Sequence, residues 1–320
     1  MSDFESGKII KRLSIWLFIA IVLFSTILML FADFGKIRKV ISEFPRIYVI
    51  GIFSSVLVNY FIRFLKWSYF LKRIGIGIPL KDSLWIFFSS FTMILSPGKL
   101  GEIIKSLILK SRFSIPISKS APVVMAERLT DLLGLAVIAA WGSSKFAYGE
   151  NYLLIIVAVM LLFIALLTQP RFWHYLEKAV FSRFSRLSRF RASIKLLEES
   201  SENLLSPSSL LVAIPLSTIS WAGEGVALYL IFSAMNVSIP NLLAISLFAH
   251  SFSSIAGAFS FLPGGLLVTE GILGVFFVRI AHISKDYAVS ATLMIRSATL
   301  WFAVILGTIV FLIGRRKDDL

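Results

Sequence analysis

The sequence predicts an all-helical protein that crosses a membrane several times. Apolar residues make up 57% of its 320 residues and the mean hydropathy is +0.86, whereas the apolar share of a soluble domain is about 45 to 50%. Several apolar runs reach the length of about 20 residues that a helix needs to cross a bilayer. Charged residues gather at the ends of these runs, where they are typical of topology signals and of contacts with anionic lipid.

Six apolar runs are long enough to form spanning helices. They cover residues 13–31, 47–65, 120–141, 152–168, 210–232 and 287–313. The first run follows Lys8, Lys11 and Arg12, is longer than a typical signal-peptide core and ends without a small-x-small cleavage site. We therefore expect it to remain as a membrane anchor.

Two further apolar regions are interrupted by a Pro-Gly pair. The first, 84–109, is broken at Pro97, and the second, 242–280, is broken at Pro263. Because proline lacks an amide donor and glycine lacks a Cβ, each break ends one helix and begins another. The arms of the first region are too short to span, which predicts a re-entrant hairpin, whereas the second region has one arm long enough to cross. The prediction is six spans plus two hairpins, or eight spans.

Lys and Arg are concentrated in the segments 66–81, 110–119 and 171–195 and near both ends of the chain. Because cytoplasmic segments carry the excess of these residues, the distribution predicts cytoplasmic termini and a multi-pass protein of the cytoplasmic membrane. A single membrane domain is predicted over 1–314, with a cytoplasmic tail at 315–320.

The segment 171–205, between the two halves of the chain, is predicted to be a basic amphipathic cytoplasmic helix. Its apolar residues recur at helical spacing and its basic residues are interleaved with them. Two placements of this helix are compatible with the pattern: on the cytoplasmic leaflet of the membrane, or packed on the protein's own surface.

The order of span, broken hairpin with a glutamate, and span with an arginine occurs twice. Glu270 lies 168 positions after Glu102, and Arg296 lies 168 positions after Arg128. The predicted topology opens the two hairpins from opposite faces of the membrane. The two copies, about 47–141 and 210–313, are therefore predicted to form an inverted-topology repeat of the kind that secondary transporters use.

Ten charged residues lie within or at the mouths of the apolar stretches. An acid or base at the bilayer centre costs about 3 kcal/mol, so ten without compensation would exceed the stability of a whole domain, about 5 to 15 kcal/mol. We therefore expect them to be paired, hydrated, or both, and to surround a path for a polar or anionic cargo. They are Arg63, Lys99, Glu102, Lys105, Glu127, Arg128, Asp131, Glu224, Glu270 and Arg296.

The segment around the first break contains two glycines, Gly98 and Gly101, and two lysines, Lys99 and Lys105. Free amides at a helix N-terminus together with lysine side chains suit a phosphate group. Alternatively, the two glycines allow neighbouring helices to cross closely, and the two lysine side chains extend towards the membrane–water interface. The spacing of a Walker A loop is absent, which disfavours ATP hydrolysis.

Two spans carry further candidate groups. Arg128 and Arg296, one from each repeat, are candidates for phosphate binding because a guanidinium group contacts phosphate through two donors. In the alternative, Arg128 forms a structural ion pair with Glu127 or Asp131 on the same helix. Glu224, flanked by two glycines, is a candidate proton carrier or a cap for a hairpin amide.

Enzyme, metal and nucleic-acid functions are not indicated. The chain has no cysteine and three scattered histidines, and it lacks a nucleophile elbow and an HExxH pattern, so we predict no catalytic residues, cofactor or metal site. The net charge of +14 is explained by topology signals and lipid contacts without nucleic-acid binding.

Four motifs follow one another along the chain: Arg63 with Trp67, Ser96-Pro97-Gly98-Lys99-x-Gly101-Glu102, Glu127-Arg128-x-x-Asp131, and Pro263-Gly264-Gly265 followed by Glu270. This ordered set resembles the lysylphosphatidylglycerol synthase transmembrane-region family, the flippase-like module also found in the multiple peptide resistance factor. The resemblance covers about residues 13 to 314. Leu267 departs from it, because a family-like Pro-Gly-Gly-x-Gly pattern has glycine at that position.

The resemblance implies movement of a lipid with a large polar headgroup between leaflets. It also implies a set of residues that line the headgroup path. These are Lys99, Glu102, Arg128, Glu270 and Arg296.

The sequence thus predicts a flippase-like transporter for an anionic phospholipid or a polyprenyl-phosphate-linked sugar. One rival is a membrane-embedded headgroup or glycosyl transferase. Another is a non-transporting scaffold for a lipid-modifying synthase or glycosyltransferase. A wide central cavity favours transport, whereas a closed bundle with every charge paired favours the scaffold.

Overall fold

The computed structural model describes residues 42–96, 101–145, 158, 161–162, 164–169, 171–175 and 191–315. This part of the chain is helical and contains no strand. Its elements, in order, are α3 (Arg46–Arg73), α4 (Leu80–Ser89), η1 (Ser90–Met93), α5 (Ile104–Phe113), α6 (Ile117–Ser143), α9 (Arg191–Leu204), α10 (Pro207–Ala234), α11 (Leu242–Phe259), η4 (Pro263–Gly265), α12 (Val268–Val275), η5 (Phe276–Ile280), α13 (Lys285–Arg296), η6 (Ser297–Trp301) and α14 (Phe302–Arg315).

Five segments of the described chain are long and apolar enough to cross a membrane: α3, α10, α11, Pro263–Ile280 and Lys285–Gly314. Three of them contain the predicted spans 47–65, 210–232 and 287–313. The predicted span 120–141 forms α6, which has 27 residues and carries four charged side chains. The span predicted at 13–31, and most of the one at 152–168, lie outside the described residues.

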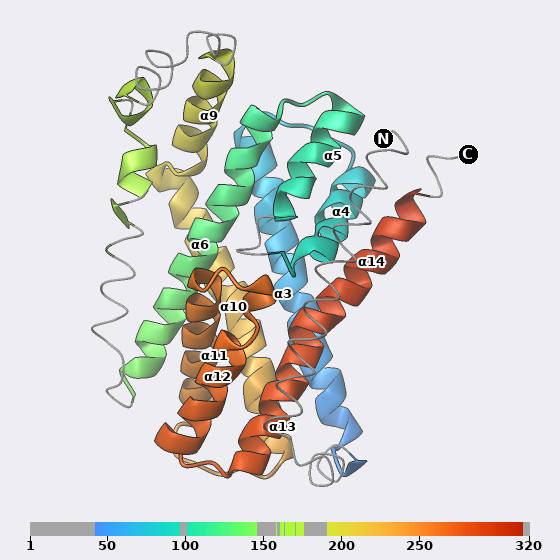
Figure 1. Ribbon diagram of the computed structural model, residues 1–320, viewed down its shortest axis with the longest axis vertical. Coiled ribbons are helices and arrows are strands. Elements are labelled where there is room, and N and C mark those ends of the chain that lie inside the picture. Colours follow the sequence, from blue (N-terminus) through green and yellow to red (C-terminus); the bar gives the residue numbers. More distant parts are fainter. Residues whose placement is uncertain are drawn as a thin grey trace.

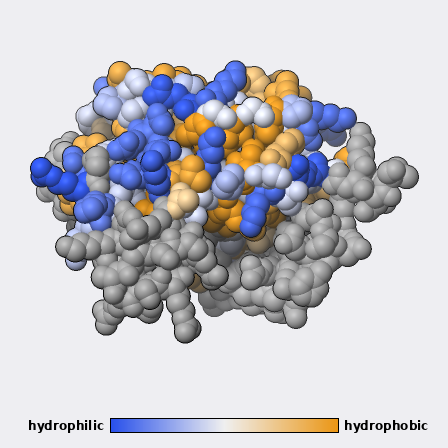
Figure 2. All heavy atoms as spheres, turned by 90° about the horizontal axis from the view of Figure 1, so that it is seen from above, coloured by the Kyte–Doolittle hydropathy of each residue, from blue (hydrophilic) through white to orange (hydrophobic). Residues whose placement is uncertain are grey.

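Large apolar side chains cover the outer faces of the long helices. Leu211 of α10 is 77% exposed and Ile47 of α3 is 70% exposed, and α14 presents Ile305, Ile309 and Leu312 outward. A soluble monomer rarely exposes so much contiguous apolar surface, so these faces are suited to lipid. Figure 2 shows one end of the molecule, where hydrophilic side chains spread over much of the face around a hydrophobic area.

Helix α3 continues past the predicted end at Leu65 to Arg73. The sequence ended this span at Leu65 and placed Lys66 in the loop segment after it, and this boundary is wrong. Lys66 lies inside the helix and is 1% exposed, because Asp131 of α6 neutralises its charge and the buried side chains of Trp67 and Phe70 extend the packed face of α3.

Two helical hairpins approach the middle of the molecule from opposite ends. Figure 1 shows α4 and α5 at the upper end and α11 and α12 towards the lower end, with the long helices α3, α6 and α10 running beside them. Helices α4 and α5 have ten residues each, whereas α11 has 18. The same order of long helix, hairpin and long segment therefore occurs in α3 to α6 and again in α10 to α14.

The tip of the second hairpin depends on backbone conformations that favour glycine. Gly264 and Gly265 have φ of 59° and 66°, which glycine adopts without steric cost. Leu267 follows with φ 72° and ψ −50°, a region that is strained for a residue with a Cβ. The position where the family-like pattern has glycine thus keeps a glycine-like conformation although leucine occupies it.

Helices α3 and α10 pack against each other more extensively than any other pair in the described chain. Asn59 Nδ2 of α3 donates a hydrogen bond to the carbonyl of Ser220 at 2.8 Å, and Tyr60 donates to the carbonyl of Thr299 at 2.7 Å. Such bonds between helices help to hold a bundle together where lipid surrounds it. Helix α9, which forms the C-terminal part of the predicted linker helix, packs on α6 and buries Leu204.

Candidate functional site

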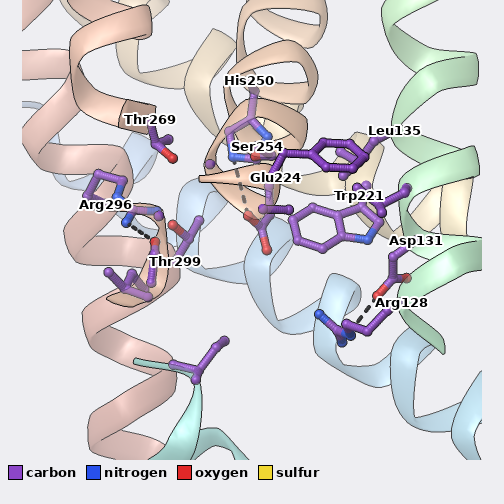
Figure 3. A pocket seen from close by; sticks show the side chains of 18 of the residues that line it. Arg128, Asp131, Leu135, Trp221, Glu224, His250, Ser254, Thr269, Arg296 and Thr299 are labelled. Carbon is purple, nitrogen blue, oxygen red and sulfur yellow. Dashed lines mark hydrogen bonds and ion pairs between the residues drawn. The ribbon is translucent and has the colours of Figure 1, made fainter. Parts of the chain in front are cut away.

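A cavity of about 240 Å³ lies where α3, α6, α10 and α11 meet the tip of the second hairpin and α13. Figure 3 shows side chains from these elements converging on it. Phe259 and Phe261, at the end of α11, belong to its lining and are 49% and 65% exposed. The cavity therefore reaches the surface of the molecule beside these two aromatic side chains.

Three guanidinium groups from three different segments line the cavity: Arg63, Arg128 and Arg296. The acids Asp131 and Glu224 line it as well. The structure thus brings together five of the charged residues that the sequence selected, although they come from α3, α6, α10 and α13. Cations outnumber acids on this lining.

Arg63 is the least compensated of the three arginines. It is 2% exposed, and within the described chain it forms no ion pair and its Nη2 has no hydrogen-bonding partner. Its guanidinium group lies 5.5 Å from the ring centre of Phe91 and 5.6 Å from that of Trp221. Cation–π contacts contribute about 1 to 2 kcal/mol each, whereas removing a cation from water costs several kcal/mol. Arg63 therefore keeps a hydrogen-bond donor without a partner in the described chain.

Arg128 and Arg296 are both paired, and their pairs are equivalent. Arg128 lies 3.0 Å from Glu102 and 3.3 Å from Asp131, and Arg296 lies 2.5 Å from Glu270. Each glutamate belongs to the second arm of a hairpin and each arginine to the following long segment. The structural ion pair that the sequence left open for Arg128 is therefore formed with Asp131.

Arg296 makes a second contact at the hairpin tip. Its Nη2 donates to the carbonyl of Gly264 at 2.7 Å, so the same side chain holds the break in the second hairpin and faces the cavity. The guanidinium suits this double role because its fork of donors can serve two acceptors at once.

Behind the cavity, buried charges alternate in sign. Lys66 pairs with Asp131, and Lys105 lies 2.8 Å from Glu127 and 3.9 Å from Glu102. Lys66 also donates to Ser217 at 2.6 Å, which ties α3 and α6 to α10. Lys66 was not among the candidate site residues selected from the sequence. The signal that could have identified it is the largely apolar stretch from Trp67 to Leu71, which continues the helix beyond Lys66.

Glu224 contacts a histidine. Its carboxylate lies 3.3 Å from Nε2 of His250 on α11, and Figure 3 shows Trp221 between this pair and the Asp131–Arg128 pair. The partner is therefore a side chain of the second hairpin, whereas the sequence suggested a backbone amide there. His250 was missed because no spacing in the sequence connects it with Glu224.

The proposed phosphate cradle at the first break is not seen in the described residues. The amide of Gly101 donates to Ser96 Oγ at 2.6 Å, and a Cβ at Gly101 would lie 2.7 Å from Met93 Cβ. Gly101 therefore allows close packing and does not offer its amide to a ligand. Lys105 is fully buried and lies over the ring of Trp67, away from the cavity lining. Gly98 and Lys99 lie outside the described residues.

Comparison with known proteins supports the resemblance. The sequence model described as Lysylphosphatidylglycerol synthase TM region matches residues 15–307. The chain belongs to this family. Among its relatives, a UPF0104 membrane protein of Methanocaldococcus jannaschii is 26% identical over 70% of this chain and 94% of its own length. A UPF0104 membrane protein of Pyrococcus horikoshii is 24% identical over 93% of this chain and 97% of its own length.

The compensation of Lys66 gives a testable prediction. Asp131→Asn leaves the ammonium group of Lys66 buried without its acid, so we expect it to destabilise the protein by about 3 to 5 kcal/mol. Adding Lys66→Met removes the uncompensated cation, and the double variant should unfold at a higher temperature than the single Asp131→Asn variant. Thermal unfolding of the purified protein in detergent measures both. Equal unfolding temperatures for the two variants would contradict the pairing.

Proposed function

We propose that this protein moves the polar headgroup of an anionic lipid from one leaflet to the other through the basic cavity. The observation that carries the proposal is Arg63, a buried cation that lines the cavity, forms no ion pair within the described chain and keeps its Nη2 without a hydrogen-bonding partner. A phosphate ester supplies one negative charge and several acceptors for a guanidinium group. The family assignment supports a lipid-related membrane function.

The pairing of the interior charges favours an anionic cargo. The interior of the described chain holds as many cations as acids: Arg63, Lys66, Lys105, Arg128 and Arg296 against Glu102, Glu127, Asp131, Glu224 and Glu270. Four of these acids, Glu102, Glu127, Asp131 and Glu270, already contact a cation other than Arg63. An anion beside Arg63 therefore gains a local partner without displacing an existing pair.

The mouth of the cavity favours a lipid over a free anion. The exposed rings of Phe259 and Phe261 stand where the cavity reaches the surface, on a molecule whose outer faces are apolar. Acyl chains can stay against such rings while the headgroup enters the polar interior.

The two hairpins suggest how the cavity changes its exposure. We infer an inverted-topology repeat from the matching element order and from the equivalent pairs Glu102–Arg128 and Glu270–Arg296. In such a repeat, movement of one hairpin relative to the long helices opens the central site to one side and closes it to the other. The proposal includes cytoplasmic termini and a location in the cytoplasmic membrane, and it makes the protein a transporter, not an enzyme.

The scaffold alternative predicts a closed interior with every charge paired. The cavity and Arg63 support transport instead. No residue pattern or geometry in the described chain favours the transferase alternative.

Lipid translocation tests the proposal. In liposomes containing fluorescent phosphatidylglycerol, we expect Arg63→Gln to lower the rate of movement between leaflets at least tenfold, because the neutral side chain no longer attracts the phosphate. Lys195→Gln is the matched control, since this side chain is 76% exposed and far along the chain on α9. It should move lipid at the wild-type rate.

The unfolding temperature of Arg63→Gln must be measured alongside, so that a folding defect is recognised. A folded Arg63→Gln protein that moves phosphatidylglycerol as fast as the wild type would refute the proposal.

We further propose that Glu224 and His250 exchange a proton with the cavity during transport. The carboxylate of Glu224 and Nε2 of His250 lie 3.3 Å apart, close enough for a proton to pass between them, and both side chains line the cavity. A gradient of one pH unit supplies about 1.4 kcal/mol per proton, enough to shift the distribution of lipid between leaflets about tenfold.

Glu224→Gln should abolish the response of lipid distribution to an imposed pH gradient, because the amide cannot carry the proton. Movement without a gradient should continue. The measurement is the fluorescent-lipid assay with and without the gradient. An undiminished response in Glu224→Gln would exclude this acid as the proton carrier.

A further inference from the structure

A second hollow, of about 350 Å³, lies outside the basic cavity between α12, η5 and α13. We name it the α12–α13 groove. Its walls are mostly apolar and include Gly271, Gly274, Val278, Val289 and Leu293. The segment that forms one wall, α12 with η5, belongs to the part of the chain that is apolar and long enough to lie in a membrane.

Two glycines of the lining, Gly271 and Gly274, leave the groove open. A Cβ added to Gly271 or Gly274 would meet no atom within 4 Å. By contrast, a Cβ on Gly225 of α10 would lie 2.6 Å from Leu247, as expected for a glycine that allows two helices to touch. The glycines of the groove therefore leave open space along the helix instead of admitting a neighbouring helix.

Basic side chains stand at one end of the groove. Arg279 and Lys285 belong to its lining, both are exposed, and neither has an ion pair within the described chain. They flank the connection from η5 to α13, which lies at the lower end of the molecule in Figure 1. Basic side chains at the ends of membrane segments commonly contact phosphate groups of lipid.

The other end of the groove touches the basic cavity. Glu270 lines the groove, and its partner Arg296 lines the cavity. Helical residues 268–280 extend over about 20 Å at 1.5 Å per residue, whereas one leaflet of hydrocarbon is about 15 Å thick. The groove thus runs from a basic end to the middle of the molecule over the depth that one acyl chain occupies.

We propose that the α12–α13 groove binds an anionic phospholipid, with an acyl chain along Gly271 and Gly274 and the phosphate at Arg279 and Lys285. A lipid suits the groove for three reasons. Its floor is apolar, one end is basic, and one wall belongs to a segment that is apolar enough to lie in a membrane. The Glu270–Arg296 pair separates this bound lipid from the basic cavity. The site does not require that the lipid crosses the membrane.

The test uses lipids whose acyl chains carry bromine, which quenches a nearby fluorophore. The chain has no cysteine, so Val289→Cys allows a single bimane label in the groove and Ile305→Cys a single label on the outer face of α14. In nanodiscs, brominated phosphatidylglycerol should quench the label at position 289 at least threefold more effectively than brominated phosphatidylcholine. At position 305 the two lipids should quench equally.

Two variants separately test the proposed phosphate site and the proposed acyl-chain site. Arg279→Gln combined with Lys285→Gln should remove the preference for phosphatidylglycerol at position 289. Gly274→Leu fills the open space, so it should reduce quenching at position 289 by both lipids and leave position 305 unchanged.

Equal quenching by the two lipids at position 289 in the parent protein would overturn the anionic-lipid site. Absence of quenching at position 289, with quenching at 305 retained, would show that protein fills the groove, either from residues 13–31 or from a second copy, and would also overturn it. Because the readout is binding, its failure is distinguishable from failure of lipid translocation, which is measured through Arg63.

Discussion

Compensation of charge in an apolar surrounding is the constraint on which this structure depends. Lys66 of α3 pairs with Asp131 of α6, and each hairpin is tied to the following long segment by one glutamate and one arginine. Removing one partner would leave a buried ion alone, which costs more than most single substitutions. The ion pairs therefore fix how the hairpins sit against the long helices, and Arg63 stands out because it forms no ion pair within the described chain.

The packing and the site use the same side chains. Arg296 holds the Gly264 carbonyl at the tip of the second hairpin and also faces the cavity, so a ligand that attracts Arg296 also acts on the hairpin. Tyr60 lines the cavity while its hydroxyl binds the backbone of Thr299. A ligand-dependent movement of the second hairpin would thus begin at contacts that already join the cavity wall to the helices around it.

Much of the architecture could be predicted from the sequence, because long apolar runs and Pro-Gly breaks act locally. The equal spacing of Glu102 and Arg128 and of Glu270 and Arg296 predicted that these residues occupy equivalent places, and they form equivalent pairs. Lys66 and His250 were missed, since each is recognised only through a partner on another helix. Gly101 was assigned to a phosphate cradle, but sequence cannot show that Ser96 already occupies its amide.

The central claim is that the cavity beside Arg63 binds an anionic headgroup. The most direct measurement is chemical modification of Ser254→Cys, since Ser254 lines the cavity and the chain has no other cysteine. The account predicts that a negatively charged sulfonatoethyl methanethiosulfonate reacts faster than its positively charged trimethylammonium analogue, and that Arg63→Gln reverses this order. If neither reagent reacts, or if the cationic reagent is faster in the parent protein, the cavity is not the anion site described here.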